Sequence, residues 1–397
     1  MQQSILTQQT DKLFYTDSHM LEFDAVVLAC EKSDKDEGLY RIVLDRTAFF
    51  PEGGGQQADT GFLGDACVKD VREKEGTICH ICDRPVPVGE TVHGRLDYDK
   101  RFDRMQNHTG EHIVSGLVHR HFGYENVGFH LGTDVTMDFD GELSGEDLLR
   151  IEREANGAVV KNLPVIAEFP DREKLAAMEY RSKIELEGQV RIVTVPGYDC
   201  CACCAPHVAF TGEIGMIKLL NGQKYKGGTR VTMVCGFRAL SDYNQKAGQI
   251  AALSVLLSAK QTEVAAAAGH MKEELAACKG KLTELRQQLF TYRAAGIDKK
   301  QPCVCLFEQE LNGNELRTLV NLCMEKCSGI CIALSGDDAS GYHFVAGSRT
   351  KDMREFGGAL NEAFQGRGGG KPEMIQGSIK GSRTSIEEWI LHKAAEN

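Results

Sequence analysis

Two histidine-containing segments far apart in the sequence most strongly constrain how this chain folds. His108 and His112 lie four positions apart in HTGEH, so a helix there places both imidazoles on one face, close enough to share a metal ion. In CCAPH, Cys203 and His207 have the same spacing, and Pro206 favours a loop over a helix. Three imidazoles and one thiolate suit zinc, whereas buried core histidines and thiols are the alternative. We therefore expect a helix and a distant loop to meet around one metal ion.

Neighbouring residues leave other metal chemistries open. Cys79 and Cys82 form a further C-x-x-C pair, which could join the later cysteine cluster in a structural site or lie as small buried thiols in an apolar strand. Glu111 turns the first segment into H-x-x-E-H, a metallopeptidase signature in which the glutamate is the general base. On an ideal helix Glu111 lies about 100° from His112, so it can reach a metal-bound water, and an exposed helix glutamate is the ordinary alternative.

Length and cysteine usage indicate a multidomain protein with reduced thiols. A chain of 397 residues exceeds what one hydrophobic core usually serves. Its 15 cysteines are odd in number, and the N-terminal segment has neither a basic nor an apolar signal-peptide region. No apolar run approaches the roughly 18 residues that span a bilayer. The sequence therefore predicts no membrane span and a cytoplasmic location.

Hydrophobic patterns divide the chain into four regions. The first is rich in short β-strands, the second mixes helices and strands, the third is one long helical pattern, and the fourth resumes α/β character with short parallel strands. The boundaries are 1–95, 96–240, 241–297 and 298–397. The helical region has a heptad seam, which predicts either a coiled-coil homodimer or a helical hairpin, with 265–269 as the place for a bend. The seam consists of Met271, Leu275, Cys278, Leu282, Leu285 and Leu289.

The charge is unevenly distributed along the chain. The net charge is −11, yet residues 241–397 carry 19 basic and 19 acidic side chains, so the acidic excess lies before them. Residues 216–241 contain no acid, and Lys224, Lys226 and Arg230 there are candidates for phosphate contacts. A sheet edge protected by lysines is the alternative interpretation.

Four motifs in the same order resemble one known family. They are VLDRTAFFPEGGGQQADTG, RMQNHTGEH, CCAPHVAFTGEIG and GRGGGKPEMIQGSI. Together they resemble the editing half of alanyl-tRNA synthetase and its free-standing relatives, the AlaX alanyl-tRNA editing proteins. The resemblance runs over nearly the whole chain. The first 95 residues are too few for an aminoacylation domain, so the long AlaX type, with a coiled coil and a DHHA1-like C-terminal domain, is the best match.

The resemblance implies a fold and a function. The fold is α+β, with an N-terminal glycine-rich β-barrel-like domain, an α/β editing domain, long coiled-coil helices and a C-terminal α/β domain that binds tRNA or dimerises. The implied function is an ATP-independent hydrolase that deacylates mischarged Ser-tRNA(Ala), with Gly-tRNA(Ala) as a further candidate. The family's zinc ligands correspond to His108, His112, Cys203 and His207.

Further site residues are inferred by position within these motifs. Gly53, Gly54 and Gly55 are expected beside the active site, with Gln56 and Asp59 as polar contacts, or else they form a tight turn. Among the expected catalytic groups, Glu111 is joined by His130 and Thr136, which could contact a serine hydroxyl. The C-terminal glycine-rich segment, with Gly369 and Lys371, is expected at the RNA backbone and is not a P-loop, because no Ser or Thr follows the lysine.

Two other functions remain open from the sequence. One is a zinc metallopeptidase of the H-x-x-E-H type, which would take a downstream glutamate as third ligand instead of Cys203. The other is a non-catalytic tRNA-binding protein whose zinc is purely structural. The position of Cys203 relative to the two histidines of HTGEH distinguishes the peptidase from the deacylase.

Overall fold

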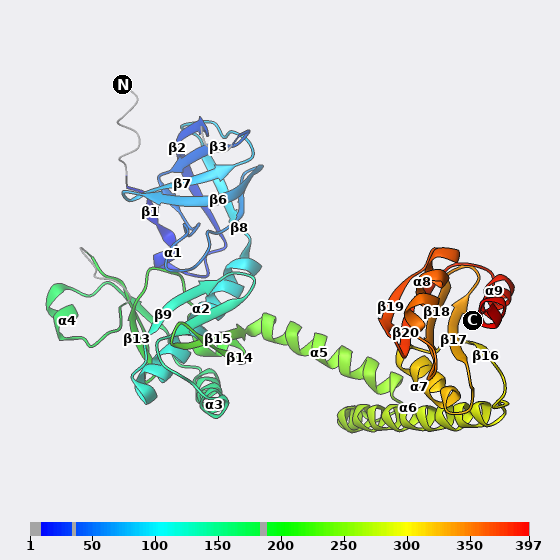
Figure 1. The fold of residues 1–397 in the computed structure, drawn as a ribbon. Coiled ribbons are helices and arrows are strands. Elements are labelled where there is room, and N and C mark those ends of the chain that lie inside the picture. Colours follow the sequence, from blue (N-terminus) through cyan, green and yellow to red (C-terminus); the bar gives the residue numbers. More distant parts are fainter. Residues whose placement is uncertain (1–8, 34–36, 183–188, 397) are drawn as a thin grey trace. The chain divides into compact units, whose positions relative to one another are not determined.

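The computed structural model describes residues 9–33, 37–182 and 189–396 (Figure 1). These residues form two compact units, Met1–Ala252 and Leu253–Asn397. The first eight residues of the segment predicted to lack a signal peptide lie outside the described residues. Among the described residues, no single helix is long and apolar enough to cross a membrane, although the helices at 236–256 and 261–295 together meet that criterion by length and composition.

The N-terminal strands of the first unit close into a barrel. Alternation of exposed and buried residues in the strands turns one side chain in two toward a core that contains Phe23, Phe49 and Leu63. The barrel order is β2 (Glu22–Lys32), β3 (Tyr40–Leu44), β7 (Thr77–Cys82), β6 (Ala66–Lys74), β5 (Gly61–Leu63) and β8 (Thr91–Leu96). The short elements β1 (Asp11–Lys12), α1 (Leu13–Thr16) and β4 (Arg46–Thr47) flank it.

A long helix and a four-stranded antiparallel sheet follow the barrel. The helix α2 (Tyr98–Phe122) ends at Gly123, which takes a left-handed φ of 72°. The second helix, α3 (Gly145–Lys161), begins with a capping box formed by Ser144 and Asp147. Both helices share one hydrophobic core with the sheet. The sheet order is β14 (Ile217–Tyr225), β15 (Gly228–Cys235), β10 (Val135–Phe139) and β9 (Asn126–Leu131).

A three-stranded antiparallel sheet completes the first unit. Its order is β11 (Ile166–Glu168), β12 (Ile192–Val195) and β13 (Asp199–Ala202), with α4 (Arg172–Ala177) between the first two strands and η1 (Thr211–Ile214) after the third. The last strand leads directly into the segment CCAPH. The mixture of helices and strands that the sequence predicts after residue 95 is therefore present in the described residues.

The second unit contains a five-stranded sheet with helices on both faces. The order is β16 (Cys303–Glu308), β17 (Ile330–Asp337), β18 (Gly341–Gly347), β20 (Met374–Ile379) and β19 (Arg367–Lys371). One core contains residues of α6 (Val264–Ala295) and α7 (Gly313–Met324), and another those of α8 (Met353–Ala363) and α9 (Arg383–Glu396). Only β16 and β17 pair in parallel, across the α7 crossover, so the expectation of parallel strands holds for this pair alone.

The helical region breaks earlier than predicted. The first helix, α5 (Gly236–Leu256), ends before Ser258, which has a positive φ of 50°, and the short η2 (Gln261–Glu263) precedes α6. Residues 265–269, where the bend was expected, continue as helix, since alanine favours that conformation. The seam residues of α6 are largely exposed, for example Leu275 at 55% and Leu285 at 53%. Coiled-coil pairing therefore stays a prediction.

A buried ion pair joins the barrel to α2. Arg101, at 0% exposure, donates through Nε to Asp59 Oδ2 at 2.9 Å and through Nη2 to the same oxygen. Its other guanidinium contacts are the carbonyl oxygens of Ser18 and Ala48. The backbone N–H of Phe50 also donates to Asp59, at 2.7 Å. Because all these contacts of Arg101 cross from α2 to the N-terminal barrel segment, this pair fixes how the two parts pack.

We expect Arg101→Met to destabilise the first unit selectively. Removing one partner of a buried ion pair leaves an uncompensated charge and costs about 3–5 kcal/mol. The single tryptophan, Trp389, packs in the second unit against Phe356 and Phe364, so its fluorescence reports that unit alone. Denaturant unfolding followed by circular dichroism should show an earlier transition, while the Trp389 transition stays in place. The exposed neighbour variant Lys100→Met serves as the control, and equal transitions for the two variants would contradict the role of the pair.

Candidate metal centre

The helix α2 places His108 and His112 one turn apart on a buried face. Both side chains are 2% exposed. Gly110 lies between them, where a Cβ atom would collide with the sulfur of Cys235 on β15. The HTGEH segment therefore needs glycine at this position so that the helix can pack directly on the sheet.

The loop after β13 brings Cys203 and His207 to the same place. Arg191 donates through Nη1 to the carbonyl oxygens of Cys203 at 3.0 Å and Ala205 at 2.8 Å. The backbone N–H of Val208 donates to Thr109 Oγ1 on α2 at 3.3 Å. As the sequence predicted, the second pair of donors comes from a loop, and these contacts hold that loop against the helix.

The four donors meet in one cluster. Ligand atoms of His108, His112, Cys203 and His207 all lie within 4.8 Å of one another. Cys203 Sγ is 3.6 Å from His108 Nε2 and 3.4 Å from His207 Nε2. In a tetrahedral zinc site, with Zn–S of about 2.3 Å and Zn–N of about 2.0–2.1 Å, the sulfur–nitrogen separation is roughly 3.6 Å. The chemistry and the spacing of these donors therefore both fit a single tetrahedral metal ion.

The outer nitrogen of each imidazole has its own polar partner. His108 Nδ1 lies 3.0 Å from Gln56 Oε1, and His207 Nδ1 lies 3.0 Å from Thr109 Oγ1. His112 Nδ1 lies 2.9 Å from a carboxylate oxygen of Asp199. Such partners orient metal-binding histidines and fix the tautomer that leaves Nε2 free to coordinate. A metal site needs such an outer partner for each histidine, whereas histidines that only fill a hydrophobic core do not.

The buried thiol of Cys203 and the imidazole of His207 have pKa values shifted toward the forms that bind metals. Burial raises the pKa of the Cys203 thiol, but the imidazoles of His108 and His207 overcome this and hold it well below its ordinary value. Burial lowers the pKa of His207 to about 3. These shifts favour the thiolate of Cys203 and the neutral imidazole of His207, which are the forms that bind metals. Despite burial, the hydrogen bond to Asp199 raises the pKa of His112.

Asp199 is placed by an unusually close approach between β13 and α2. At Gly116 on α2, a Cβ atom would collide with the carbonyl oxygen of Tyr198 and lie 2.9 Å from Cβ of Asp199. Arg181 Nε donates to the other carboxylate oxygen of Asp199 at 2.8 Å. Asp199 and Cys201 also form a second donor group with His112, so this side of the centre is rich in metal-binding side chains.

Glu111 is buried beside the centre. It is 2% exposed, and its Oε1 accepts hydrogen bonds from Ser115 Oγ at 2.7 Å and Asn126 Nδ2 at 2.5 Å. Its Oε2 lies 4.0 Å from His112 Nε2, on the side of the metal donors. An exposed surface glutamate, the ordinary alternative, is therefore excluded. The two donors on Oε1 orient the carboxylate toward the cluster.

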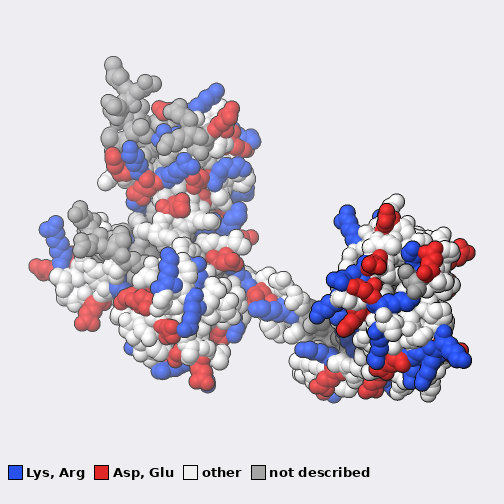
Figure 2. Space-filling view, viewed as in Figure 1, with Lys and Arg blue, Asp and Glu red and all other residues white. Residues whose placement is uncertain are grey.

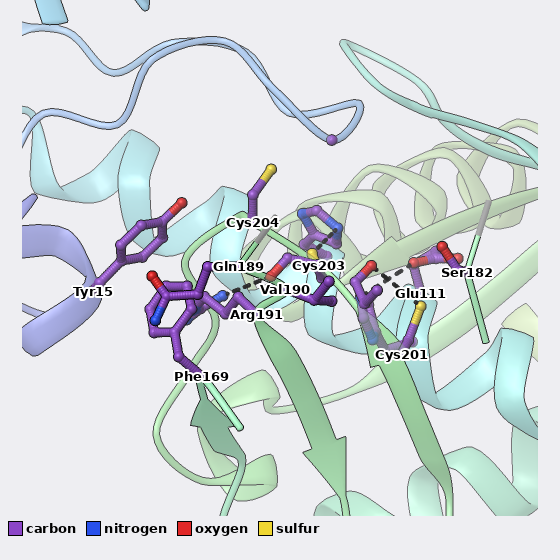
Figure 3. Close-up of a pocket in the computed structure, with 14 residues that line it drawn as sticks. Tyr15, Glu111, Phe169, Ser182, Gln189, Val190, Arg191, Cys201, Cys203 and Cys204 are labelled. Carbon is purple, nitrogen blue, oxygen red and sulfur yellow. Dashed lines mark hydrogen bonds and ion pairs between the residues drawn. The ribbon is translucent and has the colours of Figure 1, made fainter. Parts of the chain in front are cut away.

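A cavity of about 360 Å³ opens onto the donors. Figure 3 shows Tyr15, Phe169 and Arg191 at one end, Glu111 and Cys201 at the other, and Cys203 between them. Gly54 also lines it, and a Cβ atom there would be 3.4 Å from the sulfur of Cys204. The glycine-rich segment thus lies beside the centre, as expected. Gly54 and Gly55 both have positive φ, so the turn itself also requires glycine.

Other predicted contact residues do not line the cavity. Asp59 is 1% exposed and occupied by Arg101, so it has a structural role in joining the barrel to α2. Gln56 is fully buried and orients His108. His130 and Thr136 are opposite each other on β9 and β10 and are not among the residues that line the cavity.

The basic strip at 216–241 has acidic partners from other elements. Lys224 Nζ lies 3.0 Å from Glu142, Arg230 Nε lies 2.6 Å from Asp138, and Lys218 is paired with Glu152. Lys226 contacts only the ring of Tyr225, through a cation–π interaction at 5.1 Å, in the described part of the chain. Figure 2 shows positive and negative side chains interspersed on the visible face. Acidic residues from other elements therefore neutralise much of the positive charge that the sequence of this strip indicated.

The C-terminal glycine-rich segment forms an edge strand. Gly369 and Lys371 lie on β19, whose residues are all exposed, and β19 pairs only with β20 within the described sheet. This placement leaves the strand open to a partner, and RNA contact there stays a prediction. Cys79 and Cys82 lie on β7 of the barrel, and neither belongs to a potential metal-binding group among the described residues.

Three family models match separate parts of the chain. They are the class II (A) tRNA synthetases at residues 3–100, the second additional domain of threonyl- and alanyl-tRNA synthetases at 190–232, and the DHHA1 domain at 300–394. The alanyl-tRNA editing protein AlaX-L of Pyrococcus horikoshii is 27% identical over 96% of this chain and 98% of its own length. The chain is therefore similar, along nearly its whole length, to an alanyl-tRNA editing protein.

A related synthetase covers the same region. The alanine–tRNA ligase of Natronomonas pharaonis is 33% identical over 84% of this chain, which spans 38% of the ligase. The predicted resemblance to the editing-protein family is thus confirmed, together with its editing and DHHA1 domains. The four-part division of the chain and the roles of individual residues remain predictions.

Several residues around the centre were not identified from the sequence. Asp199 directly precedes the cysteine cluster, so its position was a usable signal for an outer partner of a ligand. Thr109 lies inside HTGEH and could have been considered for the same reason. Tyr15, Phe169 and Arg191 have no local pattern that marks them, because only the fold brings them to the cavity.

We expect Cys203→Ser to abolish a diagnostic metal signal. Loading the protein with Co²⁺ should give a thiolate-to-cobalt charge-transfer absorption that this variant lacks. Its metal affinity should fall by more than the roughly 10–100-fold that changes to outer partners cost. Cys204→Ser is the matched control, because Cys204 is adjacent and exposed yet lies outside the four-donor cluster. An unchanged absorption band in Cys203→Ser would show that the thiolate is not a ligand.

Proposed function

We propose that this protein is a trans-editing hydrolase that deacylates mischarged Ser-tRNA(Ala), with Gly-tRNA(Ala) as a further substrate. The observation that carries the proposal is the buried cluster of three imidazoles and one thiolate. Three of its members, His108, His112 and Cys203, line a cavity together with Glu111. AlaX-L is named as an alanyl-tRNA editing protein, and the similarity to it extends over 96% of this chain and 98% of AlaX-L. A cytoplasmic location is part of the proposal.

Such a hydrolase is needed because a binding pocket that selects an amino acid by its size discriminates poorly between alanine and amino acids of similar size. A pocket shaped for alanine cannot strongly exclude glycine, and it cannot fully exclude serine, which adds only a hydroxyl. A second site that hydrogen-bonds the hydroxyl leaves its polar groups unpaired when alanine enters, which protects the correct product. His130 and Thr136, the predicted hydroxyl contacts, do not line the cavity, so they are weaker candidates than the sequence indicated.

The residues around the cavity would have different roles in hydrolysis of the ester. We propose zinc as the ion, and when bound it would supply positive charge next to the ester. Four protein donors fill a tetrahedron, which is the pattern of a site that positions rather than activates. Glu111 would accept the proton of the water that attacks the ester carbon and return it to the departing ribose oxygen. Ser115 and Asn126 would hold the carboxylate in the required orientation.

The two other functions receive less support. A metallopeptidase of the H-x-x-E-H type requires a downstream glutamate as third ligand, whereas Cys203 and His207 accompany the histidines of α2 in the described residues. A non-catalytic RNA-binding protein with structural zinc would need no oriented carboxylate in the cavity. Lys226, Gly369 and Lys371 stay candidates for contacts with the RNA backbone because all three are exposed. Neither lysine has an ion-pair partner among the described residues.

We expect the purified protein to release serine from Ser-tRNA(Ala) and to leave Ala-tRNA(Ala) intact. Glu111→Gln should reduce kcat by about 10²–10⁴, as loss of a general base does, without loss of the metal. His108→Ala should lose the metal, and its RNA affinity and deacylation should be measured separately. Loss of hydrolysis with unchanged RNA affinity would contradict a positioning role for the ion. RNA binding without any deacylation would support the non-catalytic alternative.

We propose that the exposed seam of α6 forms a homodimer. Met271, Leu275, Leu282, Leu285 and Leu289 are each about half exposed, and their heptad spacing suits pairing with an identical helix. The C-terminal half of α6 is already packed on α7 through Phe290 and Ala294, so the free face lies mainly earlier in the helix. Part of the seam is therefore available to a second copy.

Acidic substitutions in this seam should prevent the two copies from pairing. Leu275→Glu combined with Leu282→Glu should turn a dimer into a monomer, because like charges would face each other across the pair. Light scattering after size-exclusion chromatography measures the mass. Lys279→Glu, on an exposed position of the same helix outside the seam, should leave the mass unchanged. A monomeric unmodified protein would remove the dimer proposal.

A further inference from the structure

The cavity continues beyond the metal donors to an end built from two aromatic rings and an arginine. Tyr15 and Phe169 meet edge to face, with ring centroids 5.4 Å apart and planes at 73°. The guanidinium of Arg191 lies over the Tyr15 ring, 5.0 Å from its centroid. All three line the cavity, and Figure 3 shows them grouped on one side of Cys203. None of them contributes to the proposed ester chemistry.

Arg191 differs from the other buried arginines of the first unit. Arg101 and Arg104 both lie close to the carboxylate of Asp59. Arg191 is only 8% exposed, yet within the described residues it forms no ion pair. Its Nη1 is used by two carbonyl oxygens of the loop, whereas Nε and Nη2 have no acceptor in the described part of the chain. A buried guanidinium that has spare donors and no carboxylate partner among the described residues is suited to an anionic ligand.

The two rings also have unused binding capacity. Phe169 is 41% exposed, although large apolar side chains gain from burial. The hydroxyl of Tyr15 has no hydrogen-bond partner in the residues that the structure describes, and in Figure 3 it points to the side of Cys204. Aromatic faces beside an arginine are the combination with which proteins hold nucleotides, because the base stacks on the ring and the phosphate takes the guanidinium.

We propose that Tyr15, Phe169 and Arg191 form the subsite for the terminal nucleotide of the acylated RNA. The base packs against the two rings, and a phosphate oxygen accepts hydrogen bonds from Arg191. With the nucleotide held at this end, its ribose ester faces the metal donors and Glu111 at the other. The inference rests on the proposed hydrolase function and adds to it the residues that recognise the end of the RNA independently of the attached amino acid.

Binding of AMP and adenosine tests the subsite directly, without any turnover. Isothermal titration of the metal-loaded protein should show saturable AMP binding. Phe169→Ala and Tyr15→Leu should each weaken it roughly 5- to 100-fold, as loss of one stacking contact does. Arg191→Lys should weaken AMP binding more than adenosine binding, because only AMP carries the phosphate. Phe210→Ala is the control, since Phe210 is 46% exposed and lies outside the cavity lining.

The metal content of each variant shows whether the centre survives the change. Phe169→Ala alone decides the question if Tyr15→Leu disturbs the metal, because Phe169 is exposed and distant in sequence from every donor. Absence of AMP binding, or AMP binding that is unchanged in Phe169→Ala, would overturn the subsite.

Kinetics with Ser-tRNA(Ala) separates the subsite from the function. We expect Phe169→Ala to raise KM about tenfold while kcat changes little, because the ring binds the substrate without touching the ester. Deacylation with an unaltered KM in this variant would overturn the subsite and leave the hydrolase function standing. AMP binding by the unmodified protein without deacylation of any aminoacyl-tRNA would support the subsite and refute the hydrolase function.

Discussion

The whole centre depends on the close approach of β13 to α2 at Gly116. No side chain larger than hydrogen fits there, because the carbonyl oxygen of Tyr198 already occupies the space of a Cβ atom. This approach places Asp199 next to His112. It also fixes the position at which the chain leaves β13, directly before Cys203. The metal donors are therefore positioned by backbone packing first and by hydrogen bonds second.

The three imidazoles are oriented from three separate parts of the first unit. Gln56 comes from the glycine-rich segment that follows the short strand β4 beside the barrel, Asp199 from β13, and Thr109 from α2 itself. Gln56 also forms a backbone bridge with Leu131 on β9, so the barrel segment is tied to the sheet beside the centre. For this reason the ion pair between Arg101 and Asp59, although it lies outside the cavity lining, supports the site by holding the barrel in place.

The metal donors could be predicted from the sequence because each pair of them lies within a segment of five residues. A four-residue step on a helix and a short loop segment are visible without knowledge of the fold, so His108 and Cys203 could be predicted, and the structure brings them together. The role of Asp59 could not, because its partner Arg101 is 42 positions away. The same reason applies to Arg230, whose partner Asp138 faces it only across the paired strands β10 and β15.

This contrast changes where contacts with RNA should be sought. A segment rich in lysine and arginine marked the strip at 216–241, but the fold neutralises much of that charge with acids from other elements. Arg191 is a single basic residue in its segment of sequence, and among the described residues it forms no ion pair with a carboxylate. Since desolvating a cation is costly, a buried arginine without an anion persists where a ligand supplies one. To find a positive side chain that is available for binding, it is therefore more useful to check in the fold which arginines and lysines lack an acidic partner than to look for basic segments in the sequence.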